Sequence, residues 1–189
     1  MTVCQIFYFV FFFEGFKEYG QNYIKDDEYL SEIAATAMIV NGCFKLLGGV
    51  LLDYFDFMSV YKFVMITLVV HIATISYMVK SPERYMITCV GMFAAEGAFI
   101  AMLPVLTLKI FGLKRGPQIF SYVQSAEAVS ALLCMLVVST VKPEEGYLGI
   151  FTISLVLTLT AAVCAFQLDE NTRFKYTDVY IGQVNRKIM

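Results

Sequence analysis

The stretch NGCFKLLGGVLLDYFDF, residues 41–57, decides the fold class of this chain. It is apolar for most of its length and ends in an aspartate, Asp53, that directly follows Gly-Gly-Val-Leu-Leu. The surface helix of a soluble protein shows a polar stripe that repeats about every 3.6 residues, and this stretch has almost none. The pattern therefore predicts a helix surrounded by lipid, with a charge at its end.

The composition of the whole chain agrees with this prediction. The 189 residues are 59% hydrophobic and 16% charged, and the mean hydropathy is +0.69. Because soluble domains carry about 25% charged residues, we predict an all-α integral membrane protein in a lipid bilayer. The net charge of −2 and the lack of a basic stripe give no reason to expect a nucleic-acid partner.

Six segments are long and apolar enough to cross a bilayer, whose core requires about 20 such residues per helix. We place them near residues 2–21, 30–52, 60–79, 85–108, 118–141 and 147–167, separated by short polar segments such as KSPER and KIFGLKRGP. The first is the least apolar, because Glu14, Lys17 and Glu18 interrupt its second half. The sequence thus predicts a six-helix transmembrane domain over 1–167 and a polar C-terminal tail over 168–189.

Lysine and arginine in the loops predict the orientation, because cytoplasmic loops carry an excess of these residues. With six spans both termini lie on one side, and this side holds twice as many cations as the other. Its cations are Lys62, Lys109, Lys114, Arg115, Arg173, Lys175, Arg186 and Lys187, against Lys25, Lys80, Arg84 and Lys142. We therefore expect both termini on the cytoplasmic side, or on the matrix side if the membrane is the mitochondrial inner membrane.

The second span and the turn after it resemble the loop signature of the major facilitator superfamily, Gly-x-Leu-x-Asp. The pattern resembles the oxalate/formate antiporter and monocarboxylate porter branch, in which an acidic pair and a leucine precede Asn-Gly-x-x-Arg-x-x-x-Gly-x-Leu-x-Asp. A second similarity is FGLKRGP at residues 111–117, which resembles the entry to the eleventh helix of these carriers. The matching positions are Asp26, Asp27, Leu30, Asn41, Gly42, Lys45, Gly49, Leu51, Asp53, Phe57, Val60 and Tyr61.

The resemblance implies that the chain corresponds to the C-terminal six-helix half of the carrier fold. It also implies a conformational latch, in which Asp53 at a helix end lies near Lys114 and Arg115, while Gly49 and the preceding glycine allow close packing. A carboxylate is stabilised at the start of a neighbouring helix by the helix dipole. The alternative interpretation is that Asp53 is only a carboxylate at a helix end.

The sequence departs from the family pattern at several positions. Lys45 replaces the arginine of the motif, which keeps the charge but loses the planar fork that binds a carboxylate through two bonds. Tyr54 replaces the basic residue after the aspartate, and Asp56 replaces the turn glycine. The span 118–141 lacks the lysine that oxalate carriers place there, so a pocket for small anions is poorly supported.

The ionisable residues expected inside the membrane are mainly acidic. Glu96 and Glu127 lie near the middle of the fourth and fifth spans, Glu14 in the first and His71 in the third. Such groups are costly in a bilayer unless they are paired or protonated, so they indicate a functional site. One interpretation is a transport or proton site built from Glu96, Glu127 and Glu14. The other is that these acids are protonated or hydrogen-bonded to neighbouring hydroxyl groups, and that His71 is a packing residue.

Two functions follow from these observations. We expect mainly a carrier-derived structural accessory subunit of a larger membrane assembly, because a lone half cannot rock against a second half and the anion-binding positions have changed. The alternative is a half-size transporter of small, monocarboxylate-like solutes, with or without proton coupling, that works as a homodimer or with a second half. The five cysteines are isolated, and no nucleophile–base pair or phosphate loop appears, so we expect no enzymatic activity, cofactor or metal.

Overall fold

The computed structural model describes the backbone of residues 2–140 and 147–167, and their side chains except those of residues 2–5, 14, 110, 138–140 and 148. Within these ranges every long segment is helical and no strand is present. The prediction of an all-α fold is confirmed for this part of the chain. The predicted tail over 168–189 lies outside the described residues.

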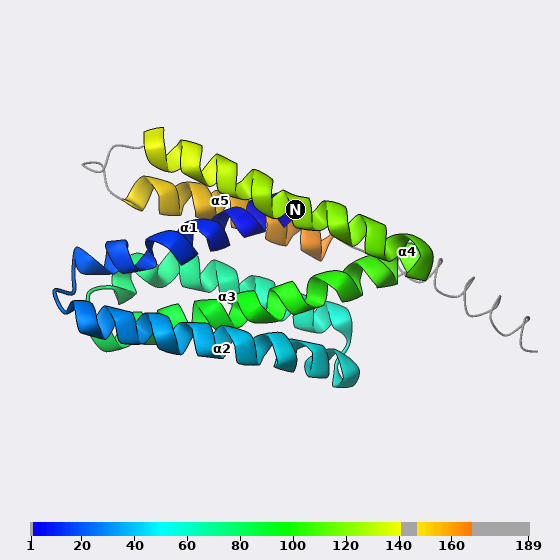
Figure 1. Ribbon diagram of the computed structural model, residues 1–189, viewed down its shortest axis with the longest axis horizontal. Helices are drawn as coiled ribbons and strands as arrows, with labels where there is room; N and C mark the ends of the chain where they lie inside the picture. Colours follow the sequence, from blue (N-terminus) through cyan, green and yellow to red (C-terminus); the bar gives the residue numbers. More distant parts are fainter. Residues whose placement is uncertain (1, 141–146, 168–189) are drawn as a thin grey trace, which may run out of the picture.

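Short turns connect α1 to α2, α2 to α3 and α3 to α4, and the helices run back and forth along the bundle (Figure 1). Their bounds are α1 Thr2–Gln21, α2 Asp27–Tyr54, α3 Phe57–Met78, α4 Pro82–Thr140 and α5 Tyr147–Phe166. The first three and the last agree with the predicted spans to within a few residues. Hydropathy located them well because long apolar runs with polar ends have few alternatives to a helix.

Helix α4 consists of two spans joined at a single residue, Gly112. We call Pro82–Lys109 its first arm and Phe111–Val137 its second arm. Gly112 has φ 74° and ψ 172°, a backbone conformation that is essentially restricted to glycine. The prediction of a polar loop over residues 109–117 is therefore wrong, because one glycine reverses the chain and Lys114 and Arg115 already belong to the second arm.

Five of the helical segments are long and apolar enough to cross a membrane within the part of the chain that the structure describes. They are α2, α3, the two arms of α4, and Gly149–Phe166 of α5. Helix α1 forms as predicted but is not among them. The chain is thus a multi-pass, all-helical membrane protein with these five candidate spans.

Aspartate side chains start two of the helices. The Asp26 carboxylate accepts a hydrogen bond from the Tyr29 amide at 3.0 Å, and the Asp56 carboxylate accepts from the Met58 and Ser59 amides at 3.0 and 3.2 Å. Such caps satisfy amides that have no partner within the helix. Asp56 is therefore the N-cap of α3. The loop signature that this segment resembles has a turn glycine at the same position.

The core is aromatic and is built around α1. The Phe12 and Phe16 rings both contact Phe93 of α4, and the Phe9 ring contacts Phe99. Outside the core, large apolar side chains are exposed on every candidate span, for example Leu46 at 77% and Phe63 at 70%. Exposed apolar surface on this scale requires a lipid or protein environment.

Candidate functional site

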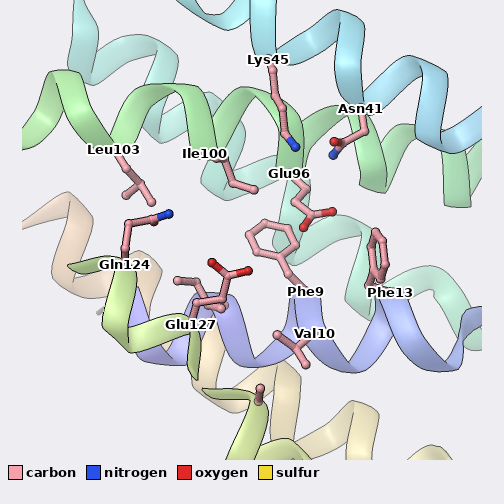
Figure 2. Close-up of a pocket in the computed structure, with 12 residues that line it drawn as sticks. Phe9, Val10, Phe13, Asn41, Lys45, Glu96, Ile100, Leu103, Gln124 and Glu127 are labelled. Atoms are coloured by element: carbon pink, nitrogen blue, oxygen red, sulfur yellow. The ribbon is translucent and has the colours of Figure 1, made fainter. Parts of the chain in front are cut away.

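A cavity of about 410 Å³ opens between α1, α2 and the two arms of α4. Its lining is apolar except for five polar side chains, which Figure 2 shows directed toward the same space. These are Asn41, Lys45, Glu96, Gln124 and Glu127, called here the polar cluster. The cavity has the size of a small-molecule site, for which about 300–1,000 Å³ is usual.

Helical spacing brings these residues to one place. Asn41 and Lys45 are four residues apart on α2, and Gln124 and Glu127 are three apart on the second arm of α4. Residues three or four apart lie on the same helix face. Glu96 lies on the first arm, one turn before Ile100. Three spans therefore each contribute polar side chains to the cavity.

The polar cluster lies well inside the membrane-spanning helices. Glu96 is near the centre of Pro82–Lys109, and Glu127 is near the centre of Phe111–Val137. Asn41 and Lys45 lie in the middle half of Asp27–Tyr54. The charged groups therefore meet at a common depth, far from both ends of the bundle.

Glu96 is the central charged group of the polar cluster. Glu96 is half-buried and lies within the electrostatic reach of both Lys45 and Glu127. Lys45 and Glu127 are exposed to the cavity. No ion pair or side-chain hydrogen bond connects Lys45, Glu96, Gln124 or Glu127 to another side chain that the structure describes. With all groups ionised the cluster carries one positive and two negative charges.

Asn41 joins the cavity to the core. Its side-chain Nδ2 donates a hydrogen bond to the Phe93 carbonyl at 2.9 Å, across the α2–α4 interface. Gly97 of the first arm faces the Asn41 carbonyl so closely that a Cβ on this glycine would collide with it. The asparagine of the resemblance motif therefore fixes how α2 and α4 pack, and it also lines the cavity.

The two glycines of the motif have different surroundings. A Cβ on Gly48 would lie 3.1 Å from the Ala98 Cα and 3.2 Å from the Ala101 Cβ, so this glycine permits close contact between α2 and α4. A Cβ on Gly49 would meet nothing within 4 Å. The close packing expected of both glycines is provided by Gly48 alone.

The charged residues of the expected latch lie at one end of the bundle but form no ion pair with one another in the described part of the chain. Asp53 lies near the end of α2, and Lys114 and Arg115 follow the Gly112 turn (Figure 1). All three side chains are exposed, and no ion pair between them is present in the described part of the chain. The structure thus places them at the same end without an ion pair between their described side chains.

His71 lies apart from the described cavity lining. The Nδ1 atom of His71 is 2.7 Å from the Thr67 carbonyl of the preceding turn, and the imidazole lies against Gly91 of the first arm. This is the environment of a packing residue at the α3–α4 interface. The side chain of Glu14 lies outside the described residues, so its part in the site stays a prediction.

Sequence reasoning located Glu96 and Glu127 but did not place the other lining residues of the cavity with them, among them Gln124, Phe9 and Phe13. Gln124 precedes Glu127 by three residues, and Phe9 and Phe13 lie one turn apart on α1, near the two acids. The spacing of Gln124 from Glu127 was the available signal. No sequence signal distinguished Phe9 and Phe13 from the other phenylalanines of α1.

No protein-family model, curated protein or solved structure matches this chain.

Proposed function

We propose that this chain forms one half of a membrane carrier for small solutes and that the cavity is its half of the solute pathway. The observation that carries the proposal is the polar cluster, where one lysine and two glutamates from three spans converge at the same depth. A charged side chain in the bilayer core is costly and faces protein or water rather than lipid. A solute pathway supplies such an environment.

The proposal includes the finer architecture expected from the sequence. Helix α1 would be the sixth span, completing a six-helix unit of the major facilitator type. It packs against α4 and α5, and the Lys17 ammonium forms an ion pair of 3.0 Å with Asp27 at the start of α2. The end of the bundle that carries Lys62, Lys109, Lys114 and Arg115 would face the cytoplasm or the matrix.

A carrier of this kind works with two units. Alternating access rocks one repeat against another around a site near the middle of the membrane. The cavity is lined by α1, α2 and the two arms of α4, and Lys45, Gln124 and Glu127 are exposed within it. A second six-helix unit, either another copy or a different chain, would close this face.

A second candidate function is that of a structural accessory subunit. The observation in its favour is the second arm of α4, the least buried of the five candidate spans, with Leu132 exposed at 64%. In this case a neighbouring subunit would cover the arm and enclose Gln124 and Glu127. The same exposed groups therefore require a protein neighbour under either function.

Reconstitution distinguishes the two functions. The full chain is extracted in mild detergent, its native mass is measured, and it is then incorporated into liposomes for uptake of labelled lactate and leucine. For a carrier we expect a particle of two six-helix units and uptake that Glu96→Gln and Glu127→Gln abolish. Glu83 is an exposed acid at the first turn of α4, outside the cavity, so Glu83→Gln is the matched control and should leave uptake unchanged.

A particle of many different subunits without uptake would support the accessory function and overturn the carrier proposal.

A further inference from the structure

The charges of the cavity are unsuited to a simple anion. Only one cation, Lys45, lines the described cavity, whereas two carboxylates, Glu96 and Glu127, face it. A monocarboxylate that paired with Lys45 would also meet these two negative charges, and like charges in a site of low dielectric constant repel strongly. A solute that carries an ammonium group would instead find partners for it.

We propose that the cavity binds a small zwitterion, a solute that carries one ammonium and one carboxylate group, as an α-amino acid does. The inference rests on the proposed function, because it names the solute class of the same pathway. The ammonium would bind between Glu96 and Glu127, and the carboxylate would bind Lys45. Bound in this way, the solute adds no net charge to the cavity and gives each of the three charged residues a partner.

The arrangement of the side chains supports this orientation. Figure 2 shows the carboxylates of Glu96 and Glu127 on either side of the Phe9 ring, with Lys45 and Asn41 beside Glu96 on the side away from Glu127. The amide group of Asn41 adjoins Lys45, one helical turn away on α2. The cavity thus has an acidic part bounded by α1 and the second arm of α4, and a basic and amide part on α2.

Aromatic side chains complete the acidic part. Phe9 and Phe13 of α1 line the cavity near the two carboxylates, and Phe13 is 38% exposed. The face of an aromatic ring attracts an ammonium group within about 6 Å of its centroid. The same rings attract a neutral hydroxyl group that replaces the ammonium only weakly.

Paired probes that differ in one group test the inference. The unfolding temperature of the full chain in lipid nanodiscs is measured with 10 mM alanine, leucine or phenylalanine, and with the matching hydroxy acids lactate, 2-hydroxyisocaproate and 3-phenyllactate. A ligand at several times its Kd raises Tm by about 2–4 °C for a chain of this length. We expect such a rise with at least one amino acid and none with its hydroxy acid.

Variants assign the effect to the cavity. Glu127→Gln should abolish the rise in Tm with the amino acid, because it removes one partner of the ammonium group. Lys45→Gln should also abolish it, because it removes the partner of the carboxylate group. Glu83→Gln should retain the shift. The inference is overturned if a hydroxy acid raises Tm as much as its amino acid, or if none of the six probes raises it.

The outcome separates this inference from the carrier proposal. If a hydroxy acid binds in a Lys45-dependent way and is taken up by liposomes, the carrier proposal stands and the zwitterion inference fails. If an amino acid binds but no labelled solute crosses the liposome membrane, the binding site stands and the carrier proposal fails.

Discussion

At the scale of single residues, Gly48 and Gly49 are neighbours with opposite surroundings. Gly48→Ala would put a methyl group 3.1 Å from the Ala98 Cα, a backbone atom that cannot move independently. Overpacking of this kind costs about 1–3 kcal/mol. We therefore expect Gly48→Ala to lower the free energy of unfolding by this amount, measured by denaturant titration in detergent micelles.

Gly49→Ala is the matched control for that substitution. Its new methyl group would meet nothing within 4 Å, and alanine favours the helix over glycine by up to about 1 kcal/mol. The control should leave stability unchanged or raise it slightly. Equal destabilisation by both substitutions would contradict the assigned roles of the two glycines.

Asn41 gives a second prediction at this scale, because its hydrogen bond to the Phe93 carbonyl joins α2 to α4. Interhelical hydrogen bonds in membrane proteins contribute about 0.6 kcal/mol on average and at most about 1.7 kcal/mol. Asn41→Ala should destabilise the protein by an amount in this range. Cys43→Ala, at an exposed position of the same helix, should have no effect in the same titration. A neutral Asn41→Ala would show that this hydrogen bond contributes nothing to the packing of the two helices.

At the scale of elements, the single-residue turn at Gly112 holds the two arms of α4 in a hairpin. The turn is tight: a Cβ on Gly116 would lie only 3.0 Å from the Leu108 Cα. A side chain at Gly112 would be strained, since φ is 74° and ψ is 172°, and such strain costs about 1–3 kcal/mol. Gly112→Ala should lower Tm, while Gly149→Ala, where a Cβ meets nothing within 4 Å, should not. Thermal unfolding followed by circular dichroism measures both.

At the same scale, the helices could be predicted from the sequence, whereas the turn within α4 could not. Hydropathy located the helices, because long apolar runs with polar ends leave little choice in a bilayer. It assigned the residues around Gly112 to a loop, because Lys114, Arg115 and Pro117 are residue types common in loops. These residues are helical, because the backbone freedom of one glycine makes a longer loop unnecessary.

The candidate site was only partly predictable for a related reason. The mid-span positions of Glu96 and Glu127 follow from counting residues, so both could be identified in advance. Their meeting with Lys45 and Gln124 depends on the rotation of each helix about its axis. That rotation is set by contacts such as Gly97 against the Asn41 carbonyl, which no local pattern contains.

At the scale of the whole molecule, the central question is what covers the cavity between α2 and the second arm of α4. Lipid is a poor neighbour for the polar cluster, and a second protein unit is common to both candidate functions. The two functions differ in whether water reaches the cavity. A carrier needs a hydrated pathway, whereas a structural contact would be packed and dry.

Cysteine accessibility measures this difference. Gln124→Cys and Leu132→Cys are introduced into a full chain whose five native cysteines are replaced by alanine or serine, and each is treated with a charged, membrane-impermeant thiol reagent. The two positions lie on the second arm, Gln124 in the cavity lining and Leu132 on the exposed apolar surface. Because the reactive species is the thiolate, which forms in water, a cysteine at 124 in a hydrated pathway should react about tenfold or more faster than one at 132. Equally slow reaction at both positions would mean that the cavity is closed by a packed neighbour, and it would favour the structural subunit over the carrier.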